Sequence, residues 1–143
     1  MDKEIKAKWL TALRSGDYAQ GKGALRRAQD DTYCCLGVLC DVMAQEGKGE
    51  WIAEGSSPDD YFLFVTDGFD KSMDIFAAAN EGHSETAGLP YKLADALGLD
   101  TAGRMPEGAF VDTQGGNAWS LVGLNDSADY TFEEIADVID EHF

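Results

Sequence analysis

The sequence predicts an α+β fold: a single helix-dominated domain over residues 1–143, with a small antiparallel β element in the middle. Apolar residues recur at helical spacing near both ends of the chain and around residue 40. A run of aromatic and β-branched residues, followed by a turn signal, lies between them. The length of 143 residues suits one hydrophobic core.

The first helix is predicted over residues 2–15. Ile5, Trp9 and Leu13 fall on one face at helical spacing, and lysine and glutamate fill the other face. Gly16 stands where a glycine commonly follows the last helical residue. Trp9 lies on the apolar face and is therefore expected in the core.

A glycine-rich loop is predicted over residues 16–29, with a short extended piece at 23–27. The second helix is predicted over 32–46. Three polar residues are candidate N-caps for it: Asp30, Asp31 and Thr32. The helix is apolar around most of its circumference, which is typical of a central core helix. Gly37 within it predicts a close backbone contact.

Residues 48–88 are predicted to be an insertion or an irregular, β-containing segment. Within it, residues 61–68 resemble a strand that runs into a turn, and Trp51-Ile52 is the candidate pairing partner. Residues 72–80 fit either a short helix or a second strand.

Four elements are predicted in the last third: a short helix from Pro90 to Leu97, a strand at 109–112, a helical turn within 118–126 and a last helix from Thr131. Thr131 and Glu134 have the spacing of a capping box. In this motif each of the two side chains accepts a hydrogen bond from the backbone N–H of the other residue.

Charge is distributed unevenly along the chain, whose formal net charge is −16. The first 29 residues contain seven basic and three acidic residues and carry +4, whereas the rest contains four basic and 24 acidic residues and carries −20. A surface this acidic repels the phosphates of nucleic acid, and we therefore do not expect direct nucleic-acid binding. The positive segment suits a small anion, or the acidic part of its own fold.

The sequence also predicts where the protein is located and how its cysteines behave. No apolar run is long enough to cross a bilayer and no secretory signal is visible, which predicts a cytoplasmic protein without a membrane partner. Cys34, Cys35 and Cys40 form an odd, clustered set that makes a poor disulfide framework. Their angular spacing on a helix does not converge on a metal, so we expect buried apolar side chains.

Catalytic motifs are absent from the sequence. His83 and His142 are far apart, and no nucleophile stands at a spacing that would make either one a catalytic base. Adjacent carboxylates arise by chance in a chain with 27 acidic residues. We therefore expect a protein that is not an enzyme and needs no cofactor or metal.

The predicted ligand-binding residues cluster in and around the cationic segment. Arg14, Lys22 and Arg26 would hold phosphates, because cations and glycine-rich backbone bind anions. Tyr18 and Tyr33 would stack on a base. Hydrogen bonds to the base or ribose would come from Gln20, Asn125 and Asp126.

Each of these residues also has an interpretation without a ligand. The cationic loop can be solvated, or can pair with acids later in the chain. Asn125-Asp126 can form a turn, because both side chains readily bond to nearby backbone.

Three blocks of sequence carry a resemblance to a known family: KWLTALRSGDYAQGKGALRR, TYCCLGVLCDV and LVGLNDSADYTFEEIADVIDEHF. In this order, with LPYKLADALGLD before the third, they resemble a family of small proteins encoded by tailed bacteriophages and prophages. Their YCCLGVLCD and LND…FxxIA motifs are the most specific part. The resemblance implies a phage accessory protein that acts inside a bacterium, but no particular biochemical activity.

Two functions are predicted from this combination. The first is a homo-oligomeric binding protein that neutralises a host defence pathway by sequestering a phosphorylated small molecule, a nucleotide signal. The alternative is an acidic, nucleic-acid-mimicking inhibitor of a basic host protein such as a nuclease or CRISPR effector. There, acids of the middle segment would stand in for phosphates: Asp59, Asp60, Asp67, Asp70 and Asp74.

Overall fold

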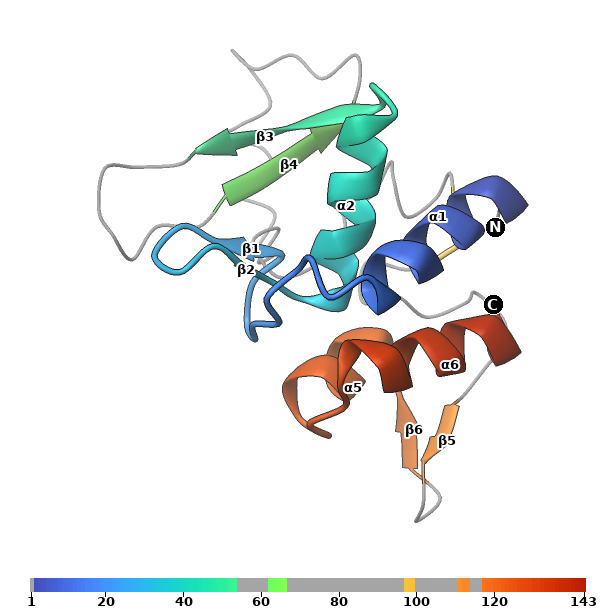
Figure 1. Ribbon diagram of the computed structural model, residues 1–143. Helices are drawn as coiled ribbons and strands as arrows, with labels where there is room; N and C mark the ends of the chain where they lie inside the picture. Colours follow the sequence, from blue (N-terminus) through green and yellow to red (C-terminus); the bar gives the residue numbers. More distant parts are fainter. Residues whose placement is uncertain (1, 54–61, 67–96, 100–110, 114–116) are drawn as a thin grey trace.

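The computed structural model describes residues 2–53, 62–66, 97–99, 111–113 and 117–143 (Figure 1). Its elements, in chain order, are α1 (Lys3–Arg14), β1 (Arg26–Arg27), β2 (Thr32–Tyr33), α2 (Cys35–Gln45), β3 (Gly49–Ala53), β4 (Phe62–Thr66), β5 (Val111–Thr113), β6 (Asn117–Trp119), α5 (Leu121–Asp126) and α6 (Phe132–His142). Helices form the core and short antiparallel strands flank them, so the fold is α+β, as predicted.

The first helix, α1, begins and ends within one residue of its predicted bounds, 2–15. The Asp2 side chain accepts hydrogen bonds from the backbone N–H groups of Glu4 and Ile5, which caps the N-terminus. Gly16 follows the helix with a positive φ of 77°. The buried face includes Trp9, which is fully enclosed.

The start of α2 differs from the prediction. Its N-cap is Cys34, whose sulfur accepts from the N–H of Gly37, and not Asp30, Asp31 or Thr32. Thr32 and Tyr33 form β2 instead, because they pair with β1 in an antiparallel hairpin. Tertiary pairing therefore delays the helix by three residues relative to its apolar pattern.

Gly37 makes the close backbone contact that was predicted. A Cβ built on it would lie 1.8 Å from the carbonyl oxygen of Leu25. Any side chain at this position would push the segment before β1 away from α2.

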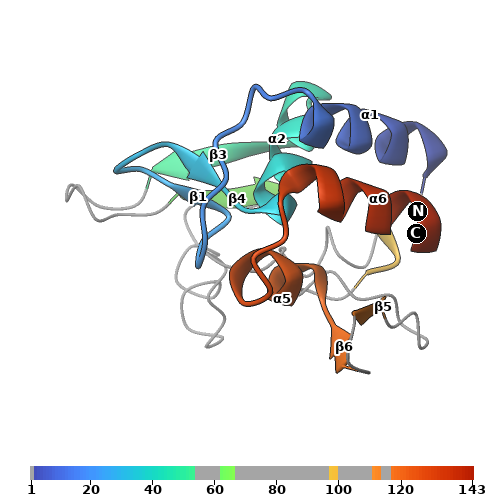
Figure 2. The same ribbon diagram turned by 60° about the horizontal axis from the view of Figure 1, so that its bottom comes forward.

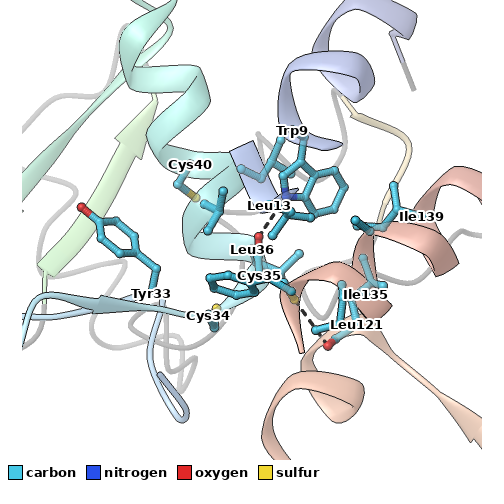
Figure 3. Packing of buried hydrophobic residues seen from close by; sticks show 14 of the residues in the cluster. Trp9, Leu13, Tyr33, Cys34, Cys35, Leu36, Cys40, Leu121, Ile135 and Ile139 are labelled. Atoms are coloured by element: carbon cyan, nitrogen blue, oxygen red, sulfur yellow. Dashed lines mark hydrogen bonds between the residues drawn. The ribbon is translucent and has the colours of Figure 1, made fainter. Parts of the chain in front are cut away.

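The core forms where α1, α2, α5 and α6 meet, and α1 and α6 lie side by side in both views (Figures 1 and 2). The indole of Trp9 donates a hydrogen bond of 3.0 Å to the carbonyl oxygen of Cys35, which joins α1 to α2 within apolar surroundings (Figure 3). The sulfur of Cys35 in turn lies 3.5 Å from the carbonyl oxygen of Leu121 at the start of α5. Both predicted roles, Trp9 in the core and apolar cysteines, are confirmed.

Among the described residues, the strands form three separate two-stranded antiparallel sheets. The predicted pairing in the middle is confirmed: β3 pairs with β4, and Trp51 lies opposite Phe64. The strand predicted at 109–112 is β5, one or two residues later, and it pairs with β6. Gln20 forms an isolated parallel bridge with Tyr33, so an extended segment before β1 runs along the other side of β2.

The C-terminal region ends in α6, which has the predicted capping box between Thr131 and Glu134. The helical turn predicted within 118–126 is confirmed as α5, whereas the interpretation of Asn125-Asp126 as a separate turn is wrong, because both residues belong to this helix. Leu97 is helical and Gly98 follows with a positive φ, which agrees with the predicted helix end. Most of that helix, and residues 72–80, lie outside the described residues. Within the described part of the chain, no helix is both long and apolar enough to cross a membrane.

Candidate ligand-binding site

The structure separates the eight predicted ligand-binding residues into three groups. Arg14 lies against α6. Tyr18, Arg26 and Tyr33 belong to an aromatic cluster beside α2. The remaining residues, Gln20, Lys22, Asn125 and Asp126, meet where the loop before β1 contacts the end of α5.

Arg14 is committed to ion pairs between two helices. Its guanidinium lies 2.8 Å from a carboxylate oxygen of Asp137 and 3.6 Å from one of Asp140. The hydrogen bond to Asp137 raises the pKa of Arg14 above its ordinary value. This is the pairing with later acids that the charge asymmetry suggested, and it places Arg14 apart from the other predicted residues.

The aromatic cluster is built from edge-to-face ring contacts. Tyr33 contacts Tyr18 at 5.0 Å and Trp51 at 6.1 Å between ring centroids, and Trp51 contacts Phe64 at 5.2 Å. The Arg26 guanidinium lies over Tyr33 and Trp51, at 5.2 and 5.5 Å from the centroids. Tyr33 is only 8% exposed, so it offers little ring surface to a ligand.

Asp41 organises the polar side of this cluster. Its carboxylate accepts from the Tyr18 hydroxyl at 2.6 Å, from the Trp51 indole at 3.0 Å and from the Gln45 amide at 3.0 Å. Burial, reinforced by the bond to Asp41, raises the pKa of Tyr18 above its ordinary range. Burial also raises the pKa of Tyr33, to about 12. Tyr18 is thus held as a neutral hydrogen-bond donor.

Three residues of the third group, all but Asp126, line a small open hollow of about 220 Å³. Its lining residues come from both ends of the sequence: Gln20, Lys22, Asn125, Asp129, Tyr130 and Thr131. Ligand pockets usually measure about 300–1,000 Å³, so this hollow suits one part of a ligand rather than all of it.

Local backbone geometry aims Gln20 and Lys22 into the hollow. The segment is extended at the bridge to Tyr33, and side chains two residues apart in an extended chain share a side. Gly21 between them faces the other way, where a Cβ would lie 2.2 Å from the Thr32 hydroxyl oxygen. A side chain at position 21 would therefore displace both lining residues.

Asn125 fixes the floor of the hollow. It is fully buried, and its amide oxygen accepts from the Gln20 amide at 2.9 Å and from the backbone N–H of Cys35 at 3.3 Å. Its amide nitrogen donates to the carbonyl oxygen of Gly21 and to Asp126, each at 2.8 Å. All of its hydrogen-bonding capacity is used by the fold, so Asn125 positions the site rather than binding a ligand.

The exposed groups of the hollow are more available. Lys22 pairs with Asp129, but half of the lysine side chain and most of the aspartate are exposed. Gln20 uses its amide nitrogen on Asn125 and on the carbonyl oxygen of Tyr130. Within the described residues, the amide oxygen of Gln20 has no hydrogen-bond donor. The hollow thus offers one ammonium donor and several oxygen acceptors.

Sequence reasoning missed three lining residues: Asp129, Tyr130 and Thr131. Thr131 was identified only as a helix cap, a role that it also has. Asp129 has a positive φ of 56°, a conformation that aspartate tolerates better than most residues. The short spacing between Asn125 and the capping box is the signal that could have pointed to this loop.

The cysteine thiols do not line the hollow. All three are buried and free, and burial raises their pKa values, to about 12 for Cys34. Among the described residues, no cluster of histidine, cysteine, aspartate or glutamate could hold a metal ion.

Comparison with known proteins identifies a family but no activity. The whole chain, residues 1–143, matches the model of the family described as Domain of unknown function (DUF8296), and the chain belongs to that family. The match includes the segment 48–88. No curated protein and no solved structure matches the chain. The function is therefore argued from the site itself.

Proposed function

We propose that the protein is a non-enzymatic binding protein that sequesters a phosphorylated small molecule, namely a nucleotide. The observation that carries this proposal is the hollow, where the Lys22 ammonium, the Gln20 amide and Tyr130 converge from distant parts of the sequence. Lys22 would bind the phosphate, and Tyr130 would lie against the base.

Exchange of ion-pair partners makes phosphate binding feasible at Lys22. Exposed salt bridges are worth about 0–1 kcal/mol, so a doubly charged phosphate can replace Asp129 as the partner of the ammonium. Arg14 is not part of this arrangement, since it is held against α6.

The size of the hollow bears on the oligomeric state. A space of about 220 Å³ covers only part of a nucleotide. A second copy of the chain would enclose the remainder, which is why we propose a homo-oligomer. The resemblance to tailed-bacteriophage proteins suggests the setting: a phage accessory protein in the bacterial cytoplasm that removes a nucleotide signal of a host defence pathway.

The test is native mass spectrometry of the full chain with the common ribonucleoside 5′-monophosphates and the matching nucleosides. We expect a nucleotide, but not its nucleoside, to bind at a fixed ratio per subunit. Lys22→Gln should weaken binding at least about tenfold, the loss of one charge-assisted contact. Arg14→Gln, the matched control, should bind as the wild type does. Equal binding by both variants, or conversion of the nucleotide to a product, would contradict the proposal.

A second candidate function is supported by the charge of α6. Its exposed face is acidic: Glu133, Glu134, Asp137, Asp140 and Glu141. Such a face could cover a basic surface of a host protein in place of nucleic acid. The acids first predicted for this role, Asp59 to Asp74, lie outside the described residues. Capture of a basic host nuclease that is lost steeply with salt, and that survives Lys22→Gln, would favour this function.

A further inference from the structure

The local charge of the hollow argues against placing the phosphate inside it. Lys22 and Asp129 neutralise one another, whereas the Asp126 carboxylate does not line the hollow and has both oxygens bonded, to the N–H of Gly23 at 3.1 Å and to Asn125 at 2.8 Å. The remaining lining groups, among them the Gln20 amide oxygen, add acceptor oxygens and no further cation, so a phosphate inside the hollow would face the Asp129 carboxylate. Lys22, half exposed, is the group that can reach outward to a phosphate at the rim.

The hydrogen-bond acceptors of the hollow that remain available determine which edge of a ligand would fit it. The Gln20 amide oxygen has no donor among the described residues, and only one Asp129 carboxylate oxygen is engaged, by Lys22. If Lys22 turns to a phosphate, both Asp129 oxygens become acceptors. A ligand edge with two adjacent N–H donors would satisfy them with paired, charge-assisted hydrogen bonds.

Guanine has such an edge, with its ring N1–H beside its exocyclic amino group. Adenine and cytosine place an acceptor nitrogen beside their amino group, which would face the carboxylate, and uracil has a single N–H between two carbonyl oxygens. Burying an acceptor against a carboxylate leaves both without a partner, so these bases are disfavoured.

We infer that the hollow selects the guanine base of a nucleotide, with the Asp129 carboxylate as the specificity-determining group and the Tyr130 ring against the base. This inference rests on the proposed function and names its ligand class. Asp129 lies in the loop just before the capping box of α6, and its carboxylate reaches Lys22 across the hollow.

The experiment is calorimetric titration of the full-length protein with GMP, AMP and guanosine. We expect GMP to bind at least about tenfold more tightly than AMP, the discrimination typical of one bidentate contact. Asp129→Asn should remove this preference. Because asparagine turns one acceptor into a donor, the variant should instead favour xanthosine monophosphate, whose carbonyl replaces the amino group of guanine.

The controls separate a change of specificity from a loss of folding. Asparagine also tolerates the left-handed backbone of position 129, so the thermal unfolding of Asp129→Asn should match that of the wild type. The gain of xanthosine monophosphate binding is a positive signal that an unfolded variant cannot give. Arg14→Gln should keep the full preference for GMP.

The outcomes distinguish this inference from the function on which it rests. Equal affinities for GMP and AMP, both weakened by Lys22→Gln, would overturn guanine selection and leave nucleotide sequestration standing. Guanosine binding as tightly as GMP would support base selection but overturn the role of the phosphate. Absence of binding by all three probes would overturn both.

Discussion

Two polar centres hold the loop between α1 and β1 against the helices, and they differ in their access to water. The Asn125 centre contacts Gln20, Gly21, Cys35 and Asp126 from a side chain that is fully buried. The Asp41 centre contacts Tyr18, Gln45 and Trp51 from a side chain that is only partly buried.

The two centres make similar numbers of hydrogen bonds, but water decides what each bond is worth. When a partner is removed at a half-exposed site, water replaces it, and little free energy is lost. At a buried site the abandoned backbone group stays unpaired, which costs about 1–3 kcal/mol for each group. The comparison therefore predicts a steep order of mutational effects.

The largest effect is expected for Asn125→Ala. The substitution leaves the N–H of Cys35 and the carbonyl oxygen of Gly21 without partners, and it opens a cavity at the N-terminus of α2. We expect a loss of about 3 kcal/mol or more in the free energy of unfolding, measured by urea denaturation. Gln20→Ala, which removes one exposed partner of Asn125, should cost only about 1 kcal/mol. Similar losses for the two variants would show that water reaches Asn125.

Asp41→Ala should have an intermediate effect. It removes the acceptor of the Tyr18 hydroxyl and the Trp51 indole, both partly buried, and we expect a loss of about 1–2 kcal/mol by the same measurement. The near-isosteric Asp41→Asn keeps one acceptor oxygen and should lose less. A loss of stability as large as that of Asn125→Ala would contradict the conclusion that access to water separates the two centres.

Alkaline pH should weaken the aromatic cluster selectively. Burial raises the pKa values of Tyr18 and Tyr33 above the ordinary tyrosine value of 10.0, to about 12 for Tyr33, so the folded state binds their protons more tightly than the unfolded state does. Their contribution is fully present below about pH 10 and is lost as pH rises toward about 12. Urea denaturation across this range should show falling stability, with a shallower slope in Tyr18→Phe. An unchanged slope would contradict the role given to Tyr18.

The smallest effect is expected at the exposed ion pairs. Arg14→Gln removes the contacts with Asp137 and Asp140, all of which are exposed side chains. Because exposed pairs contribute little and are screened by salt, we expect no resolvable change in unfolding free energy. A marked and salt-sensitive loss would show that the α1–α6 contact depends on charge rather than on its apolar core.

Sequence patterns predicted the elements that are stabilised locally. The periodicity of α1 and α6, the glycine after α1, the capping box of α6, the close contact at Gly37 and the pairing of β3 with β4 were all found where expected. The patterns failed at Thr32 and Tyr33, where strand pairing outweighed helical periodicity, and at Asn125, where a helix end was taken for a turn.

The candidate site was predicted only in part, for a physical reason. The sequence showed that cations, aromatics and glycines gather before residue 34, but not which of them face one another. Arg14 pairs with an acid of α6, and Tyr33 lies in the aromatic cluster under Arg26. The lining residues Asp129 and Tyr130 carried no motif that would have singled them out.

The sequence by itself determined α1, the capping box of α6, the apolar cysteines and the charge asymmetry, because each can be derived from residues that are close together in the sequence. The tertiary structure alone decided that Gln20 meets Asn125 across 105 positions and that Tyr18 meets Asp41 across 23. Such contacts depend on how α2, α5 and α6 pack into one core. That packing brings Gln20 and Lys22 to the loop after α5, where the hollow forms.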